Sequence, residues 1–156
     1  MIEISIPGRG KLRCSYLVLD YNGTLAVDGR LIDGVREALQ HLSGTLEIHV
    51  LTADTFGKAR SGLAGISCKL SILPTDHQDI GKRDYVKNLG AQFSVCIGNG
   101  RNDRLMLKAA ALGIAVILNE GACSATLADA DMVCTSITDA LEMLLFPLRL
   151  VAGLRT

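Results

Sequence analysis

Residues 16–25 read YLVLDYNGTL, in which a short apolar run leads directly into an aspartate and a glycine-containing turn. The apolar run is typical of a buried strand, and Asp20 at its end would be held rigidly at the edge of a sheet. Gly23 permits a turn with positive φ, Thr24 can donate a hydroxyl group, and the amides of such a loop can face an anion. The same letters are also a common turn signal, so this stretch alone does not determine a function.

Short apolar runs alternate with helical patterns along the rest of the chain. We expect a hairpin at residues 2–6 and the turn after them, and an apolar tail after Pro147 that packs on the chain itself rather than on a second subunit. Further strands are expected at 46–51, 69–73, 93–97, 114–118 and 132–134, and helices at 33–42, 55–63, 79–89, 102–112, 122–127 and 136–145. This alternation predicts an α/β fold, a Rossmann-like doubly wound parallel sheet with helices on both faces.

Polar residues follow three of these strands. Asp20 ends the first strand of the sheet, Thr52 ends the second, and the run GNGRND at 98–103 follows the fourth. Ligands of doubly wound sheets bind at the carboxyl ends of the strands, so the three clusters are expected to form one site. Asn99 and Asp103 offer the oxygen ligands that a hard cation such as Mg²⁺ takes.

The composition restricts the class of protein. The 156 residues carry no net charge and no Trp, and they are expected to form one domain, 1–156. Scattered basic residues argue against a nucleic acid or a membrane as partner. The five cysteines include no CxxC pair, and no signal peptide pattern is present, so we expect a cytoplasmic protein without a disulfide framework. The longest apolar run is shorter than the roughly 20 residues that span a bilayer.

The motifs together resemble those of the haloacid dehalogenase (HAD) superfamily, and especially the phosphorylation domain of P-type ATPases. DYNGTL at 20–25 is similar to the ATPase signature DKTGTL, and LTAD at 51–54 is similar to LTGD. Lys82, within the segment 72–90, matches the lysine of the third motif. GNGRNDRLMLKAAALGIAV at 98–116 resembles the hinge segment GDGxNDxxAL, so the resemblance covers nearly the whole chain.

The spacing of the motifs indicates a protein without a cap domain. Only 31 residues separate Asp20 from Thr52, and 29 separate Thr52 from Lys82. HAD proteins insert cap domains at these two places, and neither interval has room for one. The first interval is also where an ATPase carries its nucleotide-binding domain, so the chain is not expected to be an ion pump.

The resemblance implies a magnesium-dependent phosphohydrolase or phosphotransferase. Asp20 would attack phosphorus and form an aspartyl-phosphate, while Lys82 and the metal offset the charge of the moving phosphoryl group. Phosphate contacts are implied for Gly23, Thr24, Thr52, Ala53, Lys82 and Asn102. Ligands of Mg²⁺ are implied to be Asp20, the backbone carbonyl of Asn22, Asn99 and Asp103.

Two residues depart from the family pattern. Asn22 stands where phosphatases of the family usually carry an Asp that protonates the leaving group, and an amide cannot do this. We therefore expect slow turnover of ordinary phosphomonoesters and better turnover of acyl phosphates or activated aryl phosphates. Asn99 stands where a metal-binding Asp is usual, which predicts a weaker affinity for Mg²⁺.

Other interpretations stay open at this point. The two asparagines are also compatible with a non-catalytic regulatory or binding module that kept the fold. A receiver domain fits less well, because no acidic pair lies near the N-terminus and Lys82 precedes the GNGRND run. The expected partner is a phosphorylated substrate, either a small molecule or a protein, and an uncapped site is compatible with a homo-oligomer. Among the histidines, only His77 lies near the third motif and merits a test.

Overall fold

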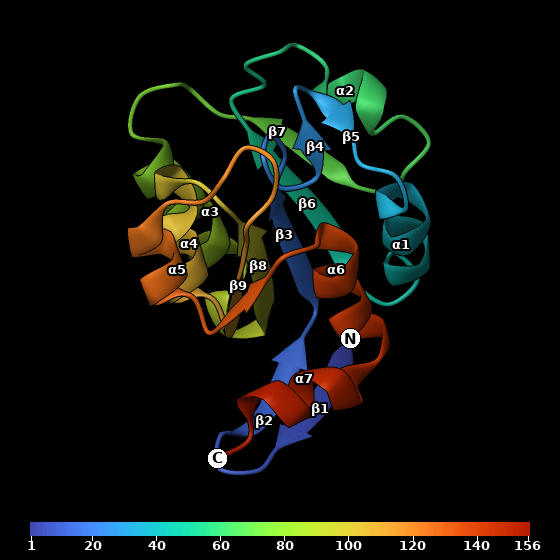
Figure 1. Cartoon of the computed structure of the whole chain (residues 1–156), viewed down its shortest axis with the longest axis vertical. Helices are drawn as coiled ribbons and strands as arrows, with labels where there is room; N and C mark the ends of the chain where they lie inside the picture. Colours follow the sequence, from blue (N-terminus) through green and yellow to red (C-terminus); the bar gives the residue numbers. More distant parts are fainter.

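A six-stranded parallel sheet forms the centre of the computed structural model, which describes residues 1–156 (Figure 1). Its strands, in spatial order, are β10 (Met132–Cys134), β9 (Leu112–Val116), β8 (Ser94–Gly98), β3 (Tyr16–Asp20), β6 (Glu47–Thr52) and β7 (Lys69–Ile72). The chain runs outward from β3 to β6 and β7, then returns to the other side of β3 for β8. The winding therefore reverses between β3 and β8, where sheets of this kind bind their ligands.

Helices cover both faces of the sheet, as the sequence predicts (Figure 1). One face carries α3 (Gln78–Leu89), α4 (Arg104–Ala109) and α5 (Ser124–Asp129), and the other carries α1 (Val35–Leu42) and α6 (Ile137–Leu145). Every residue of β8 and β9 is buried at the centre of the fold, where α4 packs on both strands and α6 contacts β9 from the other face. Burial of apolar side chains on both faces is the main stabilising term of such a fold.

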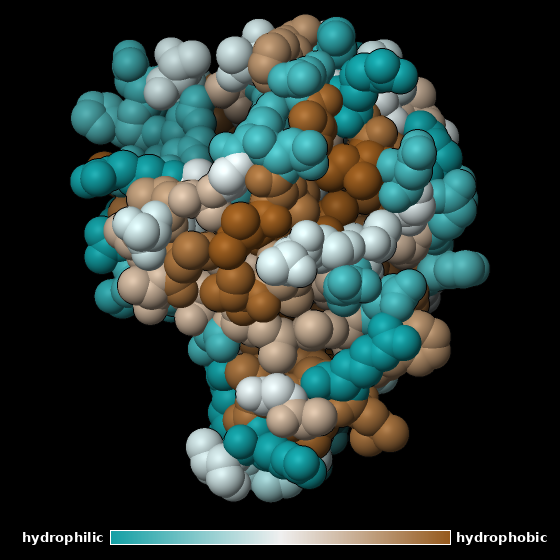
Figure 2. Space-filling model, viewed as in Figure 1, coloured by the Kyte–Doolittle hydropathy of each residue, from teal (hydrophilic) through white to brown (hydrophobic).

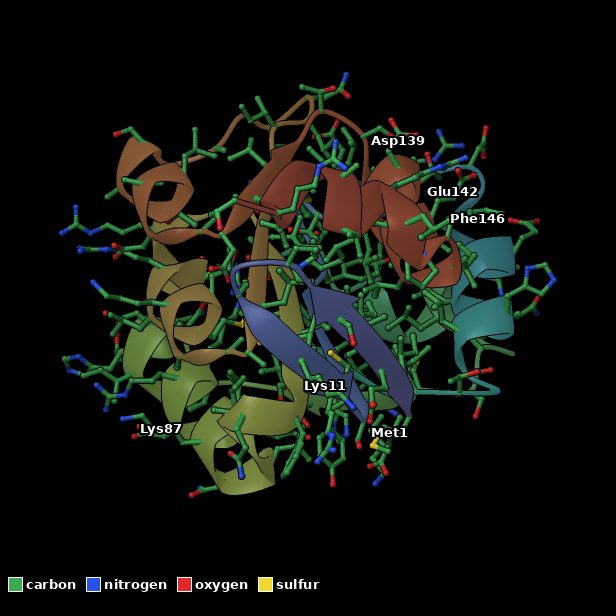
Figure 3. The ribbon with its side chains drawn as sticks, turned by 90° about the horizontal axis from the view of Figure 1, so that it is seen from below. Met1, Lys11, Lys87, Asp139, Glu142 and Phe146 are labelled. Atoms are coloured by element: carbon green, nitrogen blue, oxygen red, sulfur yellow. The ribbon has the colours of Figure 1, made fainter.

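The N-terminal hairpin and the C-terminal helix pack together at the end of the sheet where β3 begins (Figure 1). Strands β1 (Ile2–Ile6) and β2 (Gly10–Cys14) pair antiparallel, and α7 (Pro147–Leu154) packs against them with Leu150 fully buried. Seen from below, the hairpin lies across the end of the sheet, with α6 and α7 along one side of it (Figure 3). The prediction that the tail packs on the chain itself is confirmed.

The junction between α6 and α7 leaves apolar surface exposed. Phe146 is 53% exposed and Leu148 is 82% exposed. The Arg149 guanidinium lies 4.7 Å from the centre of the Phe146 ring and 2.6 Å from Glu142 Oε2. Figure 3 shows Glu142 and Phe146 close together at this junction, and Figure 2 shows apolar areas among the polar ones on the face that it draws. Exposed apolar side chains of this kind are normal on protein surfaces.

The predicted helix at 55–63 is largely wrong. Only α2 (Ala59–Gly62) is helical, and the residues before it form a loop. Asp54 has a φ of 53°, and its Oδ1 accepts hydrogen bonds of 2.9 Å from the amides of Lys58 and Ala59. In a helix that began at residue 55, backbone carbonyls would accept from these amides. The Asp54 carboxylate accepts from them instead, and such competition is usual for Asp side chains.

The predicted helix at 102–112 ends too late. Helix α4 stops at Ala109, and Leu112 already belongs to β9. Gly113 pairs with Cys96 in the sheet, and a Cβ atom on it would lie 2.4 Å from the Leu107 carbonyl oxygen. Gly113 is therefore required for the close contact between β9 and α4, and it does not end the helix.

No cap domain is present, as the spacing of the motifs predicts. The interval after β3 holds only the two-residue strands β4 (Ala26–Val27) and β5 (Arg30–Leu31) and helix α1. The interval after β6 holds only α2 and β7 before α3 begins. None of the helices combines the length and the apolar character that crossing a lipid bilayer requires.

Candidate active site

The carboxyl ends of β3, β6 and β8 meet in one small polar pocket. Asp20 is the last residue of β3, Thr52 is the last residue of β6, and Asn99 directly follows β8. The pocket has a volume of about 170 Å³. Its lining consists of Asp20, Asn22, Thr52, Ala53, Thr55, Gln78, Asn99, Gly100 and Asn102.

Beneath the pocket, Lys82 joins two carboxylates. Its Nζ donates to Asp20 Oδ1 at 2.7 Å and to Asp103 Oδ1 at 2.6 Å. Lys82 and Asp103 are fully buried, and Asp20 is 6% exposed. The remaining exposure of Asp20 is toward the pocket that it lines, so this carboxylate is the one that a ligand can reach.

Asp103 holds the loop after β8 rather than facing the pocket. Its Oδ2 accepts hydrogen bonds of 2.9 Å from the amides of Asn99 and Gly100, and its Oδ1 is bonded to Lys82. A Cβ on Gly98 would lie 2.5 Å from Asp103 Cγ, so only glycine lets the carboxylate approach the strand this closely. Both oxygens of Asp103 are thus engaged, and it does not line the pocket.

Thr24 links the loop after β3 to the loop after β8. Its hydroxyl oxygen lies 3.3 Å from Asp20 Oδ2 and 3.2 Å from Asn99 Oδ1. Gly23 has a φ of 79°, and a Cβ on it would lie 2.4 Å from Asn99 Nδ2. Asn99 Nδ2 donates to the Gly121 carbonyl at 2.9 Å, which orients the amide so that its oxygen faces Thr24. These contacts hold Asp20 and Asn99 on the same side of the pocket.

The charges of the buried residues are strongly coupled. Burial and, after it, the charge of Asp103 raise the pKa of Asp20 to about 7, against the opposing effect of Lys82. For Lys82, burial lowers the pKa, but the charges of Asp103 and Asp20 outweigh burial and keep the pKa above its ordinary value. The lysine is therefore a permanent cation beside a carboxylate whose protonation is finely balanced.

Thr52 and Asn22 present polar atoms at the pocket in different ways. Thr52 does not cap a helix, because its Oγ1 accepts a hydrogen bond of 2.9 Å from the amide of Asp54 in the following loop. Its hydroxyl hydrogen remains free for an acceptor in the pocket. Asn22 Oδ1 is buried and has no hydrogen-bond partner. A buried oxygen without a hydrogen-bond partner lowers the stability of the fold. Such an atom is typical of a site where a bound ligand or ion supplies the missing partner.

The oxygen atoms of the pocket suit a hard divalent cation that is held weakly. No group of three or more His, Cys, Asp and Glu side chains comes together to bind a metal. Asp20 is the only carboxylate in the pocket lining, and Asn22 and Asn99 add amide oxygens. Mg²⁺ commonly uses one or two carboxylates with waters and phosphate oxygens as the other ligands, so the residues present fit this ion.

The structure brings most of the predicted site residues together and adds others. Asp20, Asn22, Thr52, Ala53, Asn99 and Asn102 line the pocket, while Gly23, Thr24, Lys82 and Asp103 lie next to it. Thr55, Gln78 and Gly100 also line it and were not predicted. Gln78 lies four residues before Lys82 in α3, on the same face of the helix, and this spacing could have identified it.

Comparison with known sequences finds archaeal relatives. No protein-family model matches the chain. One uncharacterized protein of Methanocaldococcus jannaschii is 52% identical over 61 residues, which cover 39% of this chain and 66% of that protein. A second uncharacterized protein of the same organism is 49% identical over 39 residues, which cover 25% of this chain and 89% of that protein. The chain belongs to the same family as this second protein.

Comparison with solved structures identifies the fold. A magnesium-, phosphate- and KDO-bound 3-deoxy-D-manno-octulosonate 8-phosphate phosphatase from Moraxella catarrhalis has a TM-score of 0.63 at 20% identity, covering 85% of this chain and 86% of that chain. The cobalt-bound deoxy-D-mannose-octulosonate 8-phosphate phosphatase from Haemophilus influenzae has a TM-score of 0.67 at 18% identity, covering 92% and 94%. A zinc-transporting PIB-type ATPase has a TM-score of 0.62 at 22% identity, covering 79% of this chain and 20% of that one.

The fold is therefore that of solved HAD superfamily hydrolases, which include a putative one from Legionella pneumophila with a TM-score of 0.63 at 15% identity, and no cap domain interrupts it. The expected likeness to a P-type ATPase domain is found as well, since the ATPase structure matches the chain over a fifth of the pump's length. At these levels of identity the solved structures establish the fold alone, so the activity must be argued from the residues of the pocket.

Proposed function

We propose that the chain is a divalent-metal-dependent phosphohydrolase or phosphotransferase whose nucleophile is Asp20. The observation that carries the proposal is the position of this carboxylate. It is the only carboxylate of a polar pocket at the reversal point of the sheet, and Lys82 Nζ lies 2.7 Å from it. The phosphatases of like fold support the same reaction class.

In this mechanism an oxygen of Asp20 attacks the phosphorus atom of the substrate, and the bond from phosphorus to the leaving group breaks. The resulting aspartyl-phosphate is then cleaved by water, or by another acceptor if the protein is a transferase. Lys82 offsets negative charge beside the reacting group, and the hydroxyl of Thr52 donates to a phosphoryl oxygen. The buried ion pair positions Asp20 before the substrate arrives.

Three groups would hold the metal: the carboxylate of Asp20, the side-chain oxygen of Asn99 and the backbone carbonyl of Asn22. The ion, Mg²⁺ in our proposal, would supply positive charge against the phosphoryl oxygens. Asp103 would reach it only if Lys82 moved away, because both Asp103 oxygens are occupied. We therefore assign Asp103 to holding Lys82 and the loop after β8.

The chemistry of Asn22 narrows the substrate class. An amide can neither protonate a leaving group nor activate a water molecule, and these contributions are worth roughly 10²–10⁴-fold in rate. Substrates whose leaving groups depart without a proton lose little by this. We therefore propose acyl phosphates and activated aryl phosphates as better substrates than alkyl phosphomonoesters.

A second candidate function is a phosphate-binding or regulatory module without turnover. It is favoured by the two asparagines. Asn22 stands where the family usually has an acid/base Asp, and Asn99 stands where it usually has a metal-binding Asp. The intact set of Asp20, Thr52 and Lys82 favours the catalytic proposal instead. The two functions differ in whether a covalent phosphoryl group forms on Asp20.

The test is the release of phosphate from acetyl phosphate and para-nitrophenyl phosphate, with and without Mg²⁺. Magnesium-dependent release that is absent from the Asp20→Asn variant is the expected result. Mass spectrometry of acid-quenched protein should also find a phosphoryl group on the peptide that contains Asp20. Folded protein that binds Mg²⁺ but neither releases phosphate nor becomes labelled would establish the binding module instead.

A further inference from the structure

A second polar hollow adjoins the proposed phosphate pocket. It has a volume of about 400 Å³ and no apolar side chain in its lining, which consists of Thr75, His77, Gln78, Asp79, Arg101 and Asn102. Gln78 and Asn102 also line the phosphate pocket, and Asn102 Nδ2 donates to Gln78 Oε1 at 2.7 Å. This hydrogen-bonded pair lines both cavities, so the hollow is the neighbouring space for the rest of a molecule whose phosphoryl group lies at Asp20.

Arg101 gives the hollow an unpaired positive charge. Its side chain is exposed and has no ion pair or hydrogen bond within the chain. The next arginine, Arg104, is by contrast paired with Asp129. A guanidinium that is free in a cavity beside a phosphate site can bind a carboxylate or a second phosphate through two parallel hydrogen bonds.

The other lining groups suit a polar ligand. Thr75 and His77 can donate hydrogen bonds, and the His77 side chain forms no cap to α3 although it precedes that helix. Asp79 is the only negative group in the lining, and it lies in the first turn of α3, where the helix dipole attracts its carboxylate. Arg101 is therefore the charged group of the lining that can pair with an anionic ligand. The lining has no apolar surface on which a lipid or an aromatic group could pack.

We propose that this hollow binds the leaving group of the substrate, and that the substrate is a small phosphorylated acid whose second anionic group contacts Arg101. The proposal rests on the function proposed above, because it takes the pocket at Asp20 as the place of the phosphoryl group. Arg101 is a specificity-determining residue in this arrangement, since it touches the leaving group and not the reacting atoms.

The test measures binding separately from turnover. The probes are unreactive phosphonates in matched pairs, 3-phosphonopropanoate with its amide and 4-phosphonobutanoate with its amide, titrated in the presence of Mg²⁺. Two lengths are used so that the anionic group can reach Arg101. The variants are Arg101→Gln, the charge-conserving Arg101→Lys, and Arg155→Gln, which removes the same charge at the exposed C-terminus, far from the strand ends (Figure 1).

We expect the carboxylate of at least one pair to bind about fivefold more tightly than its amide, which is the upper end of the contribution of an exposed ion pair. This preference should disappear in Arg101→Gln and persist in Arg101→Lys and Arg155→Gln. Equal affinity for acid and amide in the wild-type protein, no binding of either, or a preference that survives in Arg101→Gln would each overturn the proposal. Release of phosphate from acetyl phosphate by the same preparations tests the proposed function independently, so failure of one leaves the other measurable.

Discussion

Lys82 Nζ lies 2.7 Å from Asp20 Oδ1, so the amine of α3 is bonded directly to the carboxylate at the end of β3. The two residues are 62 positions apart in the sequence, and both are withdrawn from solvent. A buried charge of this kind is tolerated only when it is paired, and Asp103 supplies the second partner of the same amine. The site thus depends on a three-residue ionic unit that also joins α3 to the sheet.

Replacement of Lys82 by Met should damage both stability and activity. The variant keeps the length of the side chain but leaves Asp20 and Asp103 as two buried carboxylates without a cation. Removing one partner of a buried pair costs about 3–5 kcal/mol, so urea unfolding at pH 7.5 should show a loss of this order. Phosphate release from acetyl phosphate should fall by roughly 10²-fold or more in protein that is still folded, because the charge beside the phosphoryl group is lost.

Lys87→Met is the matched control for this prediction. Lys87 lies on the same helix, and its side chain is exposed and points away from the body of the molecule (Figure 3). Its replacement should leave stability within about 0.5 kcal/mol of the wild type. If Lys82→Met and Lys87→Met behaved alike, the buried ionic unit would have no role in stability.

The stability of the metal-free protein should depend on pH through Asp20. Its pKa is raised to about 7 in the folded chain, from 3.8, first by burial and then by the charge of Asp103. The folded state thus holds a proton that the unfolded state has released, and the stability from this group is complete below pH 3.8 and is lost as the pH rises through about 7. Asp20→Asn lacks this titrating group. In EDTA, the unfolding free energy of the wild type should therefore fall relative to that of Asp20→Asn as the pH rises from 5 to 8. Parallel stability curves over this range would contradict the raised pKa.

Replacement of Asn22 by Asp should widen the range of substrates. The new carboxyl group has the same shape and occupies a position where Asn22 Oδ1 now has no hydrogen-bond partner. It can donate a proton to a leaving group, so turnover of an alkyl phosphomonoester should rise by roughly 10²–10⁴-fold. Turnover of acetyl phosphate needs no such proton and should change much less. A uniform rise or fall for both substrates would show that residue 22 does not act on the leaving group.

Much of the site was predictable because it lies at the ends of buried strands. Asp20 and Thr52 each end an apolar run, and parallel strands bring such ends to one edge, so their meeting follows from the alternation of strands and helices. The role of Lys82 follows from the family resemblance and not from pattern, whereas the turn at Gly23 follows from the glycine itself and agrees with its φ of 79°. A lone lysine on a helix is usually solvated, and nothing in its neighbours shows that α3 turns it inward.

What the sequence could not provide were features that depend on contacts across the fold. The position of Asp103, close against Gly98 and bonded through both oxygens, could not be distinguished from that of a metal ligand. The early end of α4 follows from the contact of Gly113 with the backbone of Leu107, a tertiary constraint that overrides a run of good helix formers. The hollow at Arg101 joins a loop after β8 to the start of α3, and no local pattern predicts that neighbourhood.

Replacement of Asn99 by Asp should strengthen metal binding and weaken the metal-free fold. The variant adds a second carboxylate to a pocket that now offers only Asp20, so calorimetry should show an affinity for Mg²⁺ that is higher by about tenfold, or ~1.4 kcal/mol. The same change removes the hydrogen bond from Asn99 Nδ2 to the Gly121 carbonyl and places a buried charge beside that oxygen. Unfolding in EDTA should therefore become easier by about 1–3 kcal/mol.

Asn88→Asp adds the same charge at the exposed surface of α3 and should leave the affinity for Mg²⁺ unchanged, which separates a local effect on the metal from one of net charge. Affinity for Mg²⁺ that stays at the wild-type value in Asn99→Asp would remove Asn99 from the metal site. The amide would then serve only to join the loop after β8 to Thr24 and Gly121, and the metal would have to rest on Asp20 and the loop that follows it.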